Sequence, residues 1–305
     1  MQNYNFHAFT KKTIDVLACH DIDVSEDAFL FTDESIEKAE NGNWDGCATE
    51  LRDKLKRFLS AILASHHRFE RDPYVRRIDL PDGKIINIGI INQQSKEWYD
   101  SPHFIATCDF LLEAQRGLFR NSLKFIDLGG HQMVWAVYYG LTSSLASVKS
   151  FEPSILNVLI GLFNCLINDV IDRVSVIPYA VSVATSSSEN AESNKMLVDY
   201  INIPMRTCQL SDYISGDFDF IKTDIEGYEY ELLGDIKYVQ LIKNAKYSHF
   251  ELHLGHLIKR GITLEDCINA LKRAGLDGSE LYSQTNMYDF LRTCNRNGFH
   301  AFVIK

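Results

Sequence analysis

Four short apolar segments, each ending in an acidic or glycine-containing turn, constrain the fold of this chain more than any other feature. Each has the pattern of a strand that enters a turn and then a helix. They are Lys124–Gly130, Val148–Ser154, Val176–Ala180 and Asp219–Gly227. In an open parallel sheet, such units place their turns at the carboxyl ends of neighbouring strands, where a ligand crevice forms. The sequence therefore predicts an α/β fold with a Rossmann-like sheet.

The chain divides into an N-terminal region and the domain that carries these segments. Apolar residues at helical spacing predict a helix over Ala48–Phe69. Alternating apolar residues around a Pro-Asp-Gly turn predict a β-hairpin over Val75–Asn92. A further amphipathic helix is expected over Phe104–Arg120. We therefore assign residues 1–120 to a helical and β-hairpin region and residues 121–305 to the Rossmann-like domain.

Strands and helices alternate along the second region. The predicted strands are Phe125–Asp127, Ser147–Phe151, Val174–Ile177, Phe218–Thr223 and Tyr247–Leu252. The predicted helices are Gln132–Tyr139, Ser154–Asn168, Tyr228–Leu233 and Thr263–Ala274. We expect Gly278–Tyr282 and Phe299–Ile304 to form a closing antiparallel pair, and the polar residues Thr185–Asn194 to form a loop.

The predicted helix over Ser154–Asn168 is apolar almost all round. A helix without a polar face is usually covered on both sides. We expect either the N-terminal region or a second subunit of a homo-oligomer to pack on it.

The net charge limits the kinds of binding partner that we expect, and the cysteine content indicates the cellular compartment. A net charge of −10 disfavours nucleic acid and anionic membrane surfaces as partners. The most apolar run, Val158–Ile167, is about half the length of a membrane-spanning helix, so no membrane span is expected. The seven cysteines show neither a CxxC pair nor zinc spacing. This pattern favours a reduced, cytoplasmic chain.

Two glycines follow the first strand of the predicted sheet. Gly129 and Gly130 come directly after Asp127-Leu128, where they let the backbone approach a ligand closely. A pyrophosphate-binding dinucleotide loop would require GxGxxG, but Gln132 and Met133 break that fingerprint. A nicotinamide-dependent oxidoreductase is therefore disfavoured, and we expect a nucleoside ligand with no phosphate to bind.

An acidic residue ends the next strand. Glu152 lies 25 residues after Asp127, at a strand–helix junction. A carboxylate at this position can accept hydrogen bonds from both ribose hydroxyls of a nucleoside. An ordinary solvated glutamate is the alternative, but the Phe-Glu-Pro setting favours ribose binding.

A pair of acids follows the fourth segment. Asp224 and Glu226 are two residues apart at a strand end, so both can project into one crevice. They can hold a substrate amine or hydroxyl, act as a base, or bind a hard metal ion. The alternative is a set of acids that stabilises a helix N-terminus, which also accounts for Glu229 and Glu231.

Three histidines, His249, His253 and His256, follow in and after the fifth strand. Together with Asp224 and Glu226 they could form a metal site or supply a general base.

At these positions the chain resembles the FkbM-type methyltransferases, which use S-adenosylmethionine (SAM). The matching pieces are Phe125–Gly130, Phe151–Pro153, Asn164, Asn168, Leu210–Ile214, Phe220–Leu233 and Phe250–His253. The resemblance implies a seven-stranded methyltransferase sheet, SAM as donor, and O-methylation of a hydroxyl on a small-molecule or glycan acceptor, such as a sugar or a natural product.

The resemblance also implies site residues. The cofactor-binding residues would be Asp127, Gly129, Gly130, His131, Glu152, Pro153, Ala180 and Asp224. Glycines 129 and 130 would shape the loop beside the methionine part, and Glu152 would bind the ribose. Asp224 would stand near the reacting centre, with Glu226 or His253 as the base, and no metal ion is assigned.

One loop departs from the family pattern, which usually runs Asp-x-Gly-Ala-Asn-x-Gly. Here His131 replaces the asparagine and Met133 replaces the last glycine. A side chain at position 133 would be expected to crowd the cofactor. The alternative function is therefore a catalytically inactive relative that serves as a binding or scaffold subunit.

Overall fold

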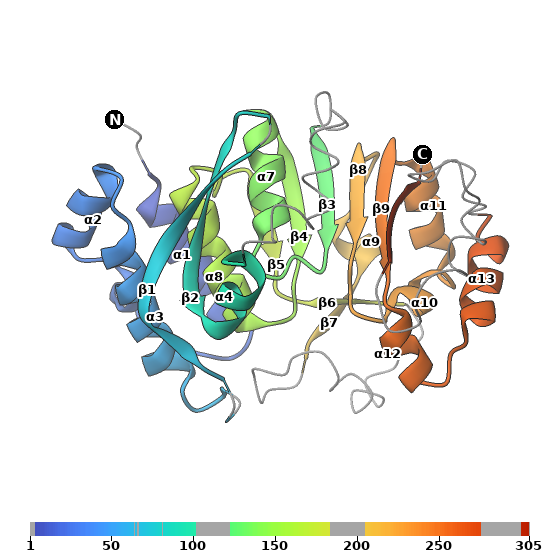
Figure 1. The fold of residues 1–305 in the computed structure, drawn as a ribbon, viewed down its shortest axis with the longest axis horizontal. Coiled ribbons are helices and arrows are strands. Elements are labelled where there is room, and N and C mark those ends of the chain that lie inside the picture. Colours follow the sequence, from blue (N-terminus) through green and yellow to red (C-terminus); the bar gives the residue numbers. More distant parts are fainter. Residues whose placement is uncertain are drawn as a thin grey trace.

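A six-stranded sheet forms the centre of the protein (Figure 1). The computed structural model describes residues 4–63, 65, 67–80, 82–101, 123–183, 205–275 and 300–304. The strand order is β10-β9-β8-β3-β4-β5, and β10 alone runs antiparallel to its neighbour. The bounds are β3 Lys124–Leu128, β4 Ser147–Phe151, β5 Val174–Ile177, β8 Phe220–Thr223, β9 Tyr247–Leu252 and β10 His300–Ile304.

The strands predicted from the sequence are confirmed in type and order. β4, β5 and β9 have the predicted bounds. The strand expected over Phe299–Ile304 is confirmed as β10, which pairs antiparallel with β9, while its expected pairing with Gly278–Tyr282 stays a prediction. Because six strands lie within the described residues, a seventh stays a prediction. The predicted strand Gly278–Tyr282, the polar segment Thr185–Asn194 and the helix Phe104–Arg120 lie outside these residues.

Helices cover both faces of the sheet. They are α7 Val134–Thr142, α8 Ile155–Ile167, α9 Leu210–Tyr213, α10 Glu229–Leu232, α11 Ile236–Asn244, α12 Leu254–Lys259 and α13 Leu264–Arg273. Helices α7 and α8 lie on one face and α11 and α13 on the other (Figure 1). A two-stranded parallel sheet, β6 Ala180–Ser182 with β7 Thr207–Gln209, lies beside the main one.

The N-terminal region forms an outer layer. Its elements are α1 Phe6–Ala18, the 3-10 helix Glu26–Phe29, α2 Asp33–Glu40, α3 Asp45–Leu59, the hairpin strands β1 Phe69–Asp79 and β2 Ile85–Asn92, and α4 Gln93–Tyr99. The hairpin was predicted, but the helix expected to reach Phe69 ends at Leu59. Phe69 instead pairs with Asn92 in the hairpin, so a long-range strand pairing overrides the helical spacing.

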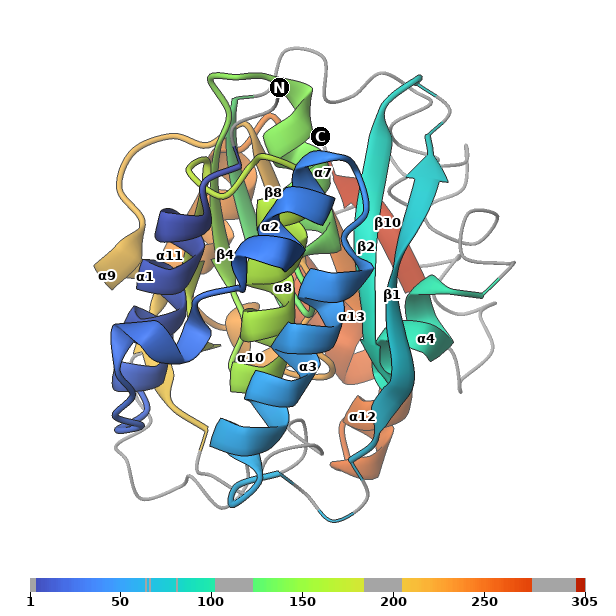
Figure 2. The ribbon, with the colours of Figure 1, turned by 90° about the vertical axis from the view of Figure 1, so that its left-hand side faces the viewer.

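The apolar helix α8 is covered by this outer layer. All thirteen of its residues are buried, and α1 and β2 pack on it (Figure 2). The N-terminal region is therefore one of the two covers that the sequence predicted. It shares one hydrophobic core with α7 and α8. The division at residue 120 stays a prediction.

Asparagines of α8 bind the backbone of β2. Asn164 Oδ1 accepts from the N–H of Gly89 at 2.8 Å, and its Nδ2 donates to the carbonyl of Gln132 at 2.8 Å. Asn168 accepts from the N–H of Asn87 at 2.8 Å and donates to its carbonyl at 2.7 Å. Buried polar groups are costly unless paired, so these bonds fix the register of the hairpin on the helix.

Among the described residues, no helix combines the length and the apolar character required to cross a membrane.

We predict that Asn164→Ala lowers the free energy of unfolding by about 2–4 kcal/mol. The substitution leaves a buried N–H and a buried carbonyl without partners, at about 1–3 kcal/mol each. Urea denaturation measures the loss. Asn244→Ala, at an exposed position of α11, is the matched control and should change stability by less than about 0.5 kcal/mol. Equal effects in the two variants would contradict the prediction.

Candidate active site at the strand tips

A row of buried polar residues crosses the sheet near the carboxyl ends of its strands. The strand register pairs His249 with Lys222, Lys222 with Asp127, and Asp127 with Ser150. All four residues are buried. These strands carry other polar residues, such as Lys149, Thr223 and Glu251, but this is the one register at which the paired residues of all four strands are polar.

Lys222 is the cation of this row. Its Nζ lies 2.9 Å from Asp224 Oδ2 and 3.6 Å from Asp127 Oδ1, and it donates to the carbonyl of Gly129 at 3.1 Å. It also lies 5.6 Å from the ring centroid of Trp135. Burial disfavours the charged form, but the surrounding carboxylates outweigh it and raise the pKa of Lys222. The lysine therefore stays charged at 2% exposure.

Asp127 lies beside Ser150 and Lys222, and Lys222 in turn binds the glycine loop. Asp127 is fully buried, and its Oδ2 accepts a hydrogen bond from Ser150 Oγ at 2.9 Å. Burial raises the pKa of Asp127, although Lys222 and Ser150 oppose the rise. Since this side chain has no exposed surface, it is placed to act on a ligand through the loop.

The glycines of the loop allow a close approach between two strand ends. Gly129 has φ +81°, and a Cβ there would lie 1.6 Å from the carbonyl oxygen of Asp224. A Cβ on Gly130 would lie 2.1 Å from Ser150 Oγ. Both glycine N–H groups donate to the carbonyl of Phe151, at 3.0 and 2.9 Å. No other residue fits at position 129, because the new Cβ would meet backbone, and at position 130 the side chain of Ser150 would have to move.

Met133, which departs from the family pattern, turns into the core. It adopts the left-handed conformation, with φ +61°, as the glycine of that pattern would readily do. Its side chain is fully buried and fills the space beside Gly161 of α8, where a Cβ would lie 2.2 Å from Met133 Cγ. The expectation that this side chain crowds the ligand crevice is therefore wrong, because a glycine in α8 accommodates it.

Glu152 lies at the tip of β4, as predicted. Its Oε2 accepts from the N–H of His131 and its Oε1 from the N–H of Ser154, both at 2.8 Å. Burial raises the pKa of Glu152 to about 7, against the opposing effect of these two bonds and of Asn157. Pro153 follows and leads into Ser154, the N-cap of α8. Ala180 lies apart from this row, at the start of β6.

Three predicted catalytic residues meet at one corner. His253 Nε2 lies 3.5 Å from Asp224 Oδ1 and 3.5 Å from Glu226 Oε2. Their side chains differ in exposure: 6% for His253, 26% for Asp224 and 44% for Glu226. His256 Nε2 lies 3.3 Å from Glu226 Oε2 on the open side. We refer to Asp224, Glu226 and His253 as the acidic corner.

Glu229 binds the second ring nitrogen of His253. It is fully buried, and its Oε1 accepts from His253 Nδ1 at 2.9 Å and from the N–H groups of Ile225 and Gly227 at 3.1 Å. The sequence assigned Glu229 to the helix start alone. Its contact with His253 spans 24 residues, so no local pattern could reveal it.

Charges at the corner set the protonation states. Burial opposes a charged His253, but Glu229, Asp224 and Glu226 outweigh it and raise its pKa to about 10. Burial likewise opposes ionisation of Asp224, yet Lys222 and His253 lower its pKa. Burial raises the pKa of Glu226. At neutral pH the corner therefore holds an imidazolium beside the ionised carboxylate of Asp224.

The acidic corner is also the one group of metal-type donors among the described residues, with its ligand atoms within 4.8 Å of one another. A metal ion bound here would compete with the proton on His253, because a metal ligand must be a neutral imidazole. The expectation of no metal ion therefore stays a prediction.

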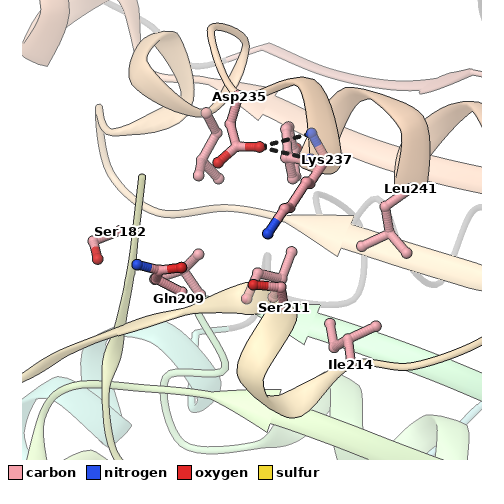
Figure 3. Close-up of a pocket in the computed structure, with 11 residues that line it drawn as sticks. Ser182, Gln209, Ser211, Ile214, Asp235, Lys237 and Leu241 are labelled. Carbon is pink, nitrogen blue, oxygen red and sulfur yellow. Dashed lines mark hydrogen bonds between the residues drawn. The ribbon is translucent and has the colours of Figure 1, made fainter. Parts of the chain in front are cut away.

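A separate pocket of about 130 Å³ lies between β7, α9 and α11 (Figure 3). Asp235 at its rim accepts from the N–H groups of Lys237 and Tyr238, which starts α11. The pocket includes none of the predicted site residues. It is smaller than the cavities of several hundred Å³ that usually hold small-molecule ligands, so the strand tips remain the candidate site.

The comparisons with known proteins identify the class. Residues 113–295, more than half of the chain, match the methyltransferase FkbM domain. The chain belongs to the FkbM methyltransferase family. A search of curated proteins finds no match.

Solved structures with a similar arrangement share little sequence. An O-methyltransferase from Bacillus cereus in complex with SAH has 12% identity, covers 67% of this chain and 84% of its own, and has a TM-score of 0.39. An O-methyltransferase from Streptomyces achromogenes in complex with SAM has 10% identity, 69% and 84% coverage, and a TM-score of 0.39. The Methanococcus jannaschii fibrillarin pre-rRNA processing protein has 12% identity, 77% and 98% coverage, and a TM-score of 0.39. Structural similarities with TM-scores this low add no evidence to the family match.

We predict that Gly129→Ala destabilises the protein by about 1–3 kcal/mol more than Gly216→Ala. Both positions have φ +81°, so both alanines carry similar backbone strain. Only at position 129 does the new Cβ meet a backbone carbonyl, whereas no atom lies within 4 Å at position 216. Chemical denaturation of the two variants measures the difference. Equal losses would show that the two strand ends do not approach as described.

Proposed function

We propose that this protein is a SAM-dependent O-methyltransferase that acts on a hydroxyl of a small molecule or glycan. The observation that carries the proposal is the acidic corner, which lies at the strand tips beside the Gly129–Gly130 loop. Membership of the methyltransferase family supplies the reaction class. The acids and the loop supply a place where a cationic methyl donor and a hydroxyl can meet.

The residues at the strand tips fit SAM. The glycine loop packs closely on the tips of β8 and β4 without side chains of its own, and Glu152 has a carboxylate with lone pairs left for ribose hydroxyls. His131 Nε2 is enclosed and makes no hydrogen bond to the described residues. Gly129, Gly130 and His131 would hold the methionine part and Glu152 the ribose. When bound, SAM supplies a methyl group activated by a sulfonium.

The negative charge of the corner suits this donor. Asp224, Glu226 and Glu229 outnumber the nearby cations Lys222 and His253. A surplus of carboxylates in a partly enclosed site attracts a sulfonium and repels anionic ligands. We assign Asp127 and Asp224 to the cofactor site, as the resemblance implies. Asp127 acts through the glycine loop, and Asp224 acts as a member of the acidic corner.

Glu226 is the proton acceptor that the geometry favours. It is the most exposed member of the corner, so an acceptor hydroxyl can reach it, and its raised pKa makes it a stronger base than an ordinary glutamate. His253 is protonated at neutral pH, which excludes it as the base in the resting site. It instead holds Asp224 and Glu226 in place, while Glu229 orients the imidazolium.

The placement of Met133 favours an active enzyme over an inactive relative, because the altered side chain packs into the core beside Gly161. A cytoplasmic location stays part of this proposal, and the five cysteines in the described part of the chain are free. A homo-oligomer also remains a prediction.

We predict that SAM affinity falls as pH decreases below about 7. Ribose hydroxyls donate to the ionised carboxylate of Glu152, so its protonation, with a pKa of about 7, removes the acceptor. Affinity should be full above pH 8 and decline below pH 7. Isothermal titration calorimetry over this range measures it.

Glu152→Gln tests the assignment directly. The variant should bind SAM more weakly by about 1.5–3 kcal/mol for each charge-assisted bond lost, and its affinity should no longer depend on pH in this window. If the variant kept the affinity of the unsubstituted protein at pH 8, Glu152 would not belong to the cofactor site.

We also predict that Glu226→Gln lowers kcat about 10²- to 10⁴-fold while SAM affinity changes little, because the amide cannot accept the hydroxyl proton. Turnover with a hydroxyl acceptor, read from release of S-adenosylhomocysteine, measures it. Glu231→Gln is the matched control, since Glu231 lies in α10, just after the turn that carries Glu226, and pairs with Arg260 instead. Full turnover by Glu226→Gln would transfer the base role to another group.

A further inference from the structure

Helix α4 of the N-terminal region contacts the loop beside the candidate cofactor site. The Tyr99 hydroxyl forms a short hydrogen bond with His131 Nδ1, and Trp98 lies with its ring centroid 6.3 Å from that of His131. Ser95 Oγ donates to Gln132 Oε1 at 2.8 Å, and Gln132 Nε2 donates to Asn92 Oδ1 at 3.3 Å.

These contacts reach residues on both sides of the family boundary. Residues 92–99 lie outside the matched region 113–295, whereas His131 and Gln132 lie inside it. His131 is also one of the positions where the loop departs from the family pattern. Its imidazole is long enough to reach Tyr99, and the departure therefore has a partner in a segment that the family match does not include.

The backbone of the loop requires support of this kind. His131 has φ +48°, a left-handed conformation that is unfavourable for a non-glycine residue. In this conformation its N–H points at Glu152 Oε2, 2.8 Å away. Asn92, Ser95 and Gln132 are fully buried, so their hydrogen bonds are shielded from water and hold the loop firmly.

We infer that α4 is a positioning element of the cofactor site: Tyr99, acting through His131, holds the N–H group that orients the Glu152 carboxylate for the ribose. The inference rests on the proposed function. It means that the matched family region does not form a complete cofactor site without residues 92–99. Tyr99 itself is a positioning residue, since its hydroxyl acts on the carboxylate through His131.

The groups around Glu152 give this role a specific readout. From β3, Asp127 raises its pKa; from the loop and from the start of α8, the N–H groups of His131 and Ser154 lower it, as does Asn157. If the His131 N–H moves away, the carboxylate loses one of the groups that favour its charged form. The pH midpoint of SAM binding should then move upward.

Tyr99→Phe tests the inference in the full-length protein, with calorimetric titration of SAM between pH 5.5 and 9. The variant should bind SAM about three- to tenfold more weakly at pH 7, as expected for the loss of one hydrogen bond, with a raised pH midpoint. KM for SAM should rise while kcat at saturation is retained. Ser95→Ala, which removes the contact with Gln132, should change affinity in the same direction.

Tyr74→Phe is the matched control. Tyr74 lies in the same region, but its hydroxyl donates to Asp100 rather than to the loop. This variant should keep the affinity and pH midpoint of the unsubstituted protein. Unchanged values in Tyr99→Phe, or equal changes in Tyr74→Phe, would overturn the inference.

Failure of the proposed function has a different signature. In that case the unsubstituted protein would not bind SAM at all. Amide hydrogen exchange at residues 129–133 then still decides whether α4 holds the loop. Faster exchange in Tyr99→Phe than in Tyr74→Phe is expected, and equal exchange would refute the contact as a support.

Discussion

The buried ammonium of Lys222 is the interaction on which the active-site end of the sheet depends. It joins the tips of β3 and β8 through Asp127, Asp224 and the carbonyl of Gly129. Removing one partner from a buried ionic group typically costs several kcal/mol, because the remaining charges have no solvent to stabilise them. Lys222 thus lets acidic side chains gather at adjoining strand ends, and it keeps Asp224 ionised. The Lys-x-Asp-x-Glu-Gly stretch of the sequence places Lys222 two residues before Asp224, as this ion pair requires.

At the strand tips, buried residues hold the structure in place, and more exposed residues are available to react with a substrate. Asp127, Lys222 and Glu229 are buried and have no surface to offer a substrate. Glu226 is more exposed and stands above them, held beside His253. A similar division applies at the tips of β3 and β4, where α4 and Asn164 of α8 hold the loop whose His131 N–H binds the Glu152 carboxylate. Rigid elements far apart in the sequence therefore fix each exposed group in position.

The sheet, and the acids that gather at its strand tips, could be predicted from the sequence, because both depend on local patterns. Short apolar runs indicate β3, β4, β8 and β9. The acidic residues at the ends of β4 and β8 are Glu152, Asp224 and Glu226. Other features depend on partners distant in the chain. The expected crowding by Met133 was wrong because Gly161 makes room for it, and the predicted extension of α3 to Phe69 was wrong because Phe69 pairs with Asn92. The roles of Glu229 and Tyr99 likewise depend on His253 and His131, which no local spacing connects to them.

The central claim is that strand tips ordered by Lys222 bind the nucleoside of SAM and direct its methyl group to the acidic corner. A crystal structure with S-adenosylhomocysteine tests this most directly. The account predicts ribose hydroxyls within hydrogen-bonding distance of Glu152, with the sulfur beside Asp224, Glu226 and His253. Ligand density elsewhere, such as in the pocket of Figure 3, or a ribose that makes no contact with Glu152, would contradict it.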